Sequence, residues 1–124
     1  IRVINAVEGA ITAVAELVIG LMISMAREIS RADREIRNGN WIKKELMGSE
    51  LKGKYLGIVG LGNIGKRLGR LARALNMNII GYDVVPIDDE FSKEVGLMKA
   101  DLDTLLSSAD YVSFHVPLLD STHH

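Results

Sequence analysis

Short apolar runs alternate with amphipathic stretches over the second half of the chain. Residues 55–59 form an apolar run between a lysine and a glycine, which is typical of a buried strand. In the next stretch apolar residues recur at helical spacing, with basic residues between them. The apolar positions are Ile64, Leu68, Leu71, Ala72 and Leu75. Further elements are predicted as a strand at 78–82, a helix to about Val95, a strand at 97–99, a helix to about Ala109 and a strand at 111–115. This alternation predicts a parallel sheet with right-handed crossovers.

The first part of the chain has a different pattern. Thr12 is predicted to cap a helix over Ala13–Arg27, after a loop. The apolar residues of this helix fall on every side, so it needs cover on every side. Either it lies at the centre of the core, or a partner surface covers it. Only ten residues separate Glu16 from Arg27, against about 20 needed to cross a bilayer. We therefore expect a buried helix and no membrane contact.

A charged, solvent-facing helical segment is predicted to continue over Ala32–Arg37. The sequence Asn38-Gly39-Asn40 is typical of a helix end. The residues that follow, up to Gly48, show no clear period and are interpreted as a connector. Trp41 is interpreted there as a packing anchor.

Composition excludes several classes of function. The 124 residues carry a formal net charge of −1, with acidic and basic residues interspersed, so no nucleic-acid partner is expected. The sequence contains no cysteine, which excludes disulfides and cysteine-bound metals. No metal site is expected, and a cytoplasmic location fits this composition.

The most informative motif follows the 55–59 run. Gly60 allows a sharp turn, Gly62 lets the backbone approach a pyrophosphate, and Gly65 lets the helix pack closely on the strand. The helix start attracts phosphate through its free N–H groups and its dipole. Asp83 ends the next apolar run, where its carboxylate can accept hydrogen bonds from ribose hydroxyls. The alternative is a strand–loop–helix unit without a ligand.

In this order, the elements resemble the nucleotide-binding domain of the NAD-dependent D-2-hydroxyacid dehydrogenases, and most closely the D-3-phosphoglycerate dehydrogenases. The glycine segment carries the resemblance together with residues 13–17, 37–41, 47–54, 81–83 and 115–118. It implies an α/β fold of Rossmann type, with helices on both faces of a parallel sheet. Residues 1–124 would be an NAD-binding domain, with 1–54 as dimerisation helix and connector and 55–124 as the βαβ core. The Ala13–Arg27 helix would pack against its twin in a homodimer.

The resemblance also implies the roles of individual residues. Gly60, Gly62 and Gly65 would form the phosphate turn, with Asn63 and Ile64 beside the pyrophosphate of NAD(H). Asp83 would bind the adenosine ribose. The adenine side would be walled by three consecutive residues: His115, Val116 and Pro117. The alternative for His115 is an ordinary histidine at a strand end.

Two departures from the family pattern bear on activity. Val7 stands where the family commonly has proline before the long helix. The chain stops just after the fourth strand, before the positions of the family's arginine, glutamate and catalytic histidine. We therefore expect a dehydrogenase fragment, truncated after the fourth strand, without catalytic residues and inactive alone. In the intact enzyme a hydride would pass between NAD and a 2-hydroxy acid. The alternatives are a non-catalytic NAD-sensing module and a purely structural dimerisation module; a glycine-rich methyltransferase fits the other motifs poorly.

Overall fold

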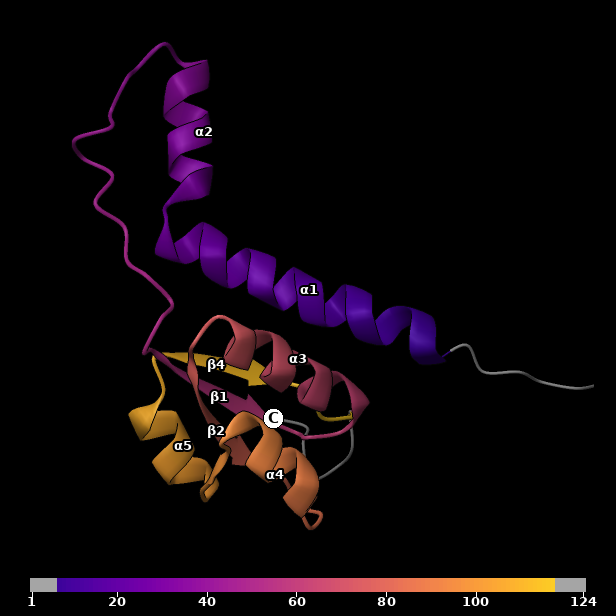
Figure 1. The fold of residues 1–124 in the computed structure, drawn as a ribbon. Helices are drawn as coiled ribbons and strands as arrows, with labels where there is room; N and C mark the ends of the chain where they lie inside the picture. The colour runs from indigo at the N-terminus through magenta and orange to yellow at the C-terminus, as the bar shows by residue number, and fades with distance from the viewer. Residues whose placement is uncertain (1–6, 118–124) are drawn as a thin grey trace, which may run out of the picture.

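Helices and strands alternate through most of residues 7–117, which the computed structural model describes (Figure 1). In chain order they are α1 (Val7–Ala26), α2 (Ile29–Arg37), β1 (Tyr55–Val59), α3 (Asn63–Ala74), β2 (Asn78–Tyr82), α4 (Asp89–Val95), β3 (Met98–Lys99), α5 (Leu102–Ser108) and β4 (Tyr111–Phe114). The four predicted strands and the helices between them are confirmed. Residues 1–6 and 118–124 of the expected domain lie outside this description.

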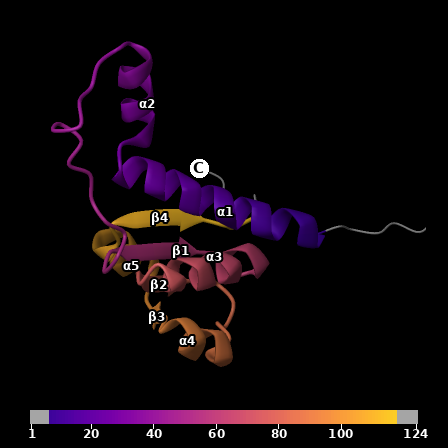
Figure 2. The same ribbon diagram turned by 45° about the horizontal axis from the view of Figure 1, so that its top comes forward.

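The strands form one parallel sheet in the order β3-β2-β1-β4. Leu56 of β1 pairs with Ile79 of β2 on one side and with Tyr111 of β4 on the other. Figure 2 shows the strands side by side, with β4 at one edge of the described sheet. Because the strand order reverses between β1 and β4, the carboxyl ends of these strands flank a crevice of the kind in which open α/β sheets bind ligands.

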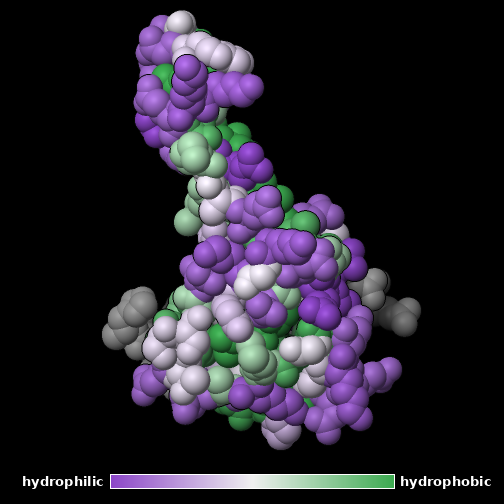
Figure 3. Space-filling view, turned by 60° about the vertical axis from the view of Figure 1, so that its left-hand side comes forward, coloured by the Kyte–Doolittle hydropathy of each residue, from purple (hydrophilic) through white to green (hydrophobic). Residues whose placement is uncertain are grey.

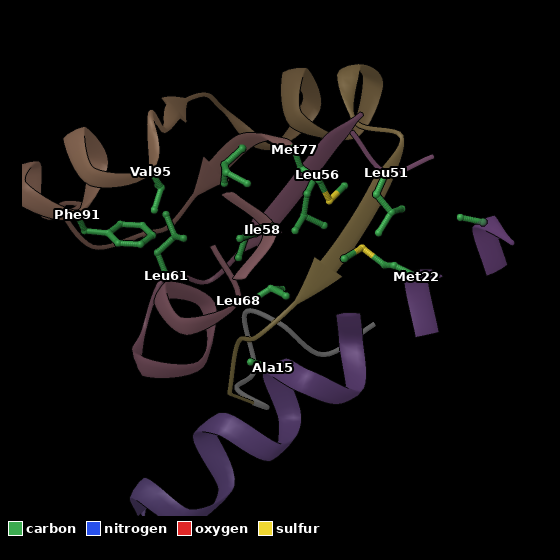
Figure 4. Close-up of a cluster of buried hydrophobic side chains, with 13 residues drawn as sticks. Ala15, Met22, Leu51, Leu56, Ile58, Leu61, Leu68, Met77, Phe91 and Val95 are labelled. Atoms are coloured by element: carbon green, nitrogen blue, oxygen red, sulfur yellow. The ribbon is translucent and has the colours of Figure 1, made fainter. Parts of the chain in front are cut away.

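Helices cover both faces of this sheet, as predicted. On one face α3 and α4 pack against Leu56, Ile58 and Ile79, and α1 lies over α3. Figure 4 shows Ala15 and Met22 of α1 reaching this core. On the other face α5 places Leu105 against Val59 and Ile80 of the sheet. A Cβ at Gly57 would lie 2.6 Å from the Leu105 side chain, so this glycine sets how closely α5 packs.

Helix caps account for the short helices. Asp101 caps α5, because its side chain accepts from the Thr104 N–H at 2.7 Å. This bond lowers the pKa of Asp101 below its ordinary value. Gly96, with φ of +64°, ends α4 where the sequence predicts a stop.

The predicted start of α1 is wrong. The helix is already formed at Val7, so Thr12 lies inside it and is not its cap. Residues 7–12 contain no proline. Gly9, the one glycine among them, costs only about 1 kcal/mol of helix stability, which tertiary context readily overrides. The longer helix makes Gly9–Ala26 apolar and long enough to cross a membrane by length and composition alone, contrary to the ten-residue count.

The expectation that α1 is buried all round is also wrong for the single chain. Its inner face packs on α3 through Ala15, Met22 and Ala26, which rules out a central core helix. Its outer face leaves Leu17, Leu21 and Met25 exposed to 61%, 54% and 69%. This row, at i, i+4 and i+8, is called the outer stripe below.

Residues 28–48 form an arm that stands clear of the body (Figures 1 and 3). Glu28 has φ of +53°, which breaks the expected helical continuation and turns α2 away from α1. Arg31 of α2 then forms ion pairs with Glu28, at the start of the same helix, and with Glu45 of the connector. Trp41 is 78% exposed, so its prediction as a packing anchor is wrong within the single chain: the turn at Glu28 carries it away from the core.

Candidate functional site

The glycine turn sits between the carboxyl ends of β2 and β4. Gly60 has φ of +92°, a conformation that favours glycine. Its N–H donates to the Tyr82 carbonyl at 2.9 Å, and a Cβ would lie 2.6 Å from the His115 carbonyl oxygen. The sharp turn predicted at Gly60 therefore has two physical causes, the backbone dihedral angle and the nearby strand end.

The other two glycines of the motif differ in their surroundings. A Cβ at Gly65 would overlap the Gly60 carbonyl, so Gly65 allows α3 to lie directly against the turn. Gly62 is the N-cap of α3, and a Cβ there would meet no atom of the described residues within 4 Å, its chain neighbours aside. Asn63, the first residue of α3, is exposed, and Ile64 is half-buried. The space in front of Gly62 is therefore open to a ligand.

Asp83 is anchored directly to the glycine turn. Its Oδ2 accepts from the Leu61 N–H at 2.6 Å, and its Oδ1 accepts from the Val85 N–H at 3.1 Å. Each carboxylate oxygen can accept more than one hydrogen bond, so capacity remains for ligand hydroxyls. These two contacts fix the carboxylate beside the turn.

Two open hollows adjoin Asp83. One, of about 450 Å³, is lined by Leu61, Gly62, Lys66, Asp83, Val85, Pro86, Ile87 and Asp88. The other, of about 720 Å³, extends along 82–87 to Asp89, Lys99, Ala100 and Asp101. The loop between β2 and α4 contributes residues to both.

His115 lies next to the turn but across it from Asp83. The backbone N–H of His115 donates to the Val59 carbonyl at 2.7 Å. The Nε2 atom of its ring lies 2.8 Å from the Ser113 hydroxyl. Partial burial lowers the pKa of His115, so the ring is mainly neutral at pH 7. Val116 approaches the Gly60 position, and Pro117 is exposed. His115 and Val116 border the turn, and none of the three residues lines either hollow.

Sequence reasoning missed the charged residues around the hollows. Lys66 Nζ lies 3.0 Å from Asp88 Oδ2, and Lys99 Nζ lies 2.8 Å from Asp89 Oδ1. The partners are 22 and 10 residues apart, so no local pattern pairs them. Within residues 7–117 no group of three or more histidine and acidic side chains could hold a metal ion.

Comparison with known proteins identifies the class of protein that carries this turn and carboxylate. The family described as "D-isomer specific 2-hydroxyacid dehydrogenase, NAD binding domain" matches residues 19–124. The chain belongs to this family, and it is an NAD-binding domain of Rossmann type.

Two curated relatives illustrate the similarity. The chain is 44% identical to hydroxypyruvate reductase of Thermotoga maritima, over 100% of the chain and 39% of that protein. It is 40% identical to D-3-phosphoglycerate dehydrogenase of Archaeoglobus fulgidus, over 98% of the chain and 23% of that protein. The chain thus spans less than two fifths of the length of either relative.

Solved structures agree with this assignment. D-mandelate dehydrogenase of Rhodotorula graminis superposes with a TM-score of 0.86 at 35% identity, over 91% of the chain and 36% of that structure. D-lactate dehydrogenase of Escherichia coli gives 0.82 at 34% identity, over 91% and 35%. The family and fold implied by the sequence resemblance are confirmed.

Proposed function

We propose that this chain binds NAD(H) in the hollow beside the glycine turn, within a D-2-hydroxyacid dehydrogenase. In this proposal the pyrophosphate lies against Gly60, Gly62 and Gly65, beside Asn63 and Ile64. The adenosine ribose is bound by Asp83. The adenine side is walled by the three residues that follow β4: His115, Val116 and Pro117.

One observation carries this proposal. Gly62, which has open space in front of it, and the fixed carboxylate of Asp83 line the same hollow. The first suits a group that must approach backbone N–H groups closely, as a phosphate does at a helix start. The second suits a hydroxyl donor. A dinucleotide offers both groups, a pyrophosphate and a ribose.

The proposal extends to the intact enzyme. Bound NAD supplies hydride chemistry, and the protein contributes binding, orientation and electrostatics. We propose hydride transfer between NAD and a 2-hydroxy acid, because the relatives named above are a hydroxypyruvate reductase and a D-3-phosphoglycerate dehydrogenase. Residues 55–124 form the dinucleotide-binding core in this proposal, and 1–54 form the dimerisation segment and connector. A cytoplasmic location is proposed from the absence of cysteine.

Titration of the chain with NADH, followed by calorimetry or nicotinamide fluorescence, tests the binding proposal. We expect saturable binding with one NADH per chain. ADP-ribose should compete, since it carries the pyrophosphate and both riboses. Absence of binding at millimolar NADH by a folded chain would contradict the proposal and favour a purely structural module.

We expect Asp83→Ser to weaken NADH and to relax discrimination against NADPH. The substitution removes a charged acceptor worth about 1.5–3 kcal/mol and removes charge repulsion toward a 2′-phosphate. Calorimetric titration with both nucleotides measures the ratio of their affinities. Glu90→Gln, which removes a carboxylate that lines neither hollow, is the control. Equal or tighter binding of NADPH by the parent chain would argue against NAD preference.

A homodimer through the Ala13–Arg27 helix is part of the proposal. Its support is the outer stripe, because three large apolar side chains in one helical row rarely remain in water without a partner. Figure 3 shows hydrophobic residues in green near the neck between the arm and the body. A two-fold axis would bring the same stripe from both chains together.

A further inference from the structure

Both lysines that line the hollows are neutralised by consecutive aspartates. Lys66 is paired with Asp88, and Lys99 is paired with Asp89. The Lys99 ammonium also donates to the Ile87 carbonyl at 3.3 Å. Among the residues that line the two hollows there is no other lysine or arginine. A ligand that enters beside Asp83 therefore meets carboxylates and no unpaired cation among these residues.

The geometry of Asp88 makes its pairing specific. Its Oδ1 caps α4 by accepting from the Glu90 N–H at 2.9 Å, and its Oδ2 faces the Lys66 ammonium. Because both contacts favour the ionised carboxylate, the pKa of Asp88 is lowered, mainly by Lys66, and the group is charged at neutral pH. The cap holds the carboxylate in place, so the pair does not depend on a freely rotating side chain.

Lys66 lies close to the glycine turn. Its N–H donates to the Gly62 carbonyl at 2.9 Å, and its side chain lines the same hollow as Gly62 and Asp83. An unpaired ammonium in this position would attract an additional phosphate on the ribose. The ion pair with Asp88 removes that attraction and adds a second carboxylate to the hollow.

We propose that Asp88 is a second determinant of cofactor selectivity beside Asp83, because it neutralises Lys66 and so disfavours a dinucleotide phosphorylated at the ribose 2′ position. This inference rests on the proposed NAD(H) site. Asp88 acts here as a positioning residue, through Lys66, and asparagine or serine at this position can still cap α4.

The test uses Asp88→Asn in the full chain, with NADH and NADPH titrated by calorimetry. Asparagine keeps a cap acceptor but loses the charge, so α4 is retained and Lys66 is released. We expect the affinity for NADPH relative to NADH to rise about tenfold, the size of one charge-assisted hydrogen bond. Asp88→Ser, another good cap, should give the same shift and serves if the asparagine variant is poorly folded.

Glu94→Gln is the matched control. Glu94 holds Arg70 through two contacts of 2.8 and 2.9 Å between the same two helices, one turn further along, and neither residue lines a hollow. This variant loses the same charge and loosens the same helix pair. It should leave the NADPH to NADH ratio unchanged, whereas an equal shift would mean that the effect is general.

A double variant tests whether Lys66 carries the effect. Adding Lys66→Gln to Asp88→Asn should abolish the gain in NADPH affinity. If the gain persists, or if Asp88→Asn leaves the ratio unchanged while the parent binds NADH, the inference is overturned and the proposed site stands. If the folded parent binds no NADH, the proposed site and the inference both fail.

Discussion

Gly62→Ala is expected to abolish most NADH binding while leaving the fold intact. The backbone of Gly62 has φ of −70° and an extended ψ, which alanine adopts without strain. Apart from the chain neighbours of Gly62, no atom of residues 7–117 lies within 4 Å of the added methyl group, so the free energy of unfolding should change little. The methyl group would instead occupy the space proposed for the pyrophosphate. A clash of this kind costs about 1–3 kcal/mol, which weakens binding by about 5- to 150-fold.

Gly65→Ala is the comparison variant for Gly62→Ala in both stability and NADH binding. Its methyl group would overlap the Gly60 carbonyl, a backbone atom that cannot move without disturbing β1 and α3. We expect the free energy of unfolding to fall by about 3 kcal/mol or more. Thermal denaturation and NADH titration of both variants separate the roles. Strong NADH binding by Gly62→Ala would show that this turn does not approach the cofactor.

The sequence was sufficient to predict the sheet and the turn because their determinants are local. An apolar run of five residues, a glycine with positive φ and an acidic residue at a strand end each act within a few positions of the chain. The Rossmann type of the fold came from the family resemblance rather than from these local patterns. The structure agrees, with Asp83 carried to Leu61 at the turn by the pairing of β1 with β2.

The parts that the sequence did not predict depend on distant neighbours. Nothing local indicates that Lys66 pairs with Asp88, because the contact exists only once α4 packs on α3. The turn at Glu28 was missed because positive φ is uncommon in a residue other than glycine, and glutamate gives no signal for it. The early start of α1 was missed because a capping threonine is a weak signal without a helix breaker before it.

Leu21→Glu is expected to convert a dimer to a monomer. Leu21 lies at the middle of the outer stripe, between Leu17 and Met25. Burying a leucine side chain contributes about 1.5–3 kcal/mol. In a two-fold dimer the side chain is lost from both chains, so the free energy of association would fall by about 3–6 kcal/mol. The two introduced carboxylates would also face each other across the axis. Sedimentation or light scattering of the parent and variant at matched concentrations measures the mass.

Leu106→Glu distinguishes loss of an interface from a general effect of added charge. Leu106 is a leucine on α5 with a similar exposure, 46% against 54% for Leu21. It lies on the helix that covers the opposite face of the sheet from α1, so its substitution should leave the mass unchanged. Unchanged melting temperature in both variants would show that the monomer folds alone. A parent that sediments as a monomer, or a dimer that survives Leu21→Glu, would place the contact between chains away from α1.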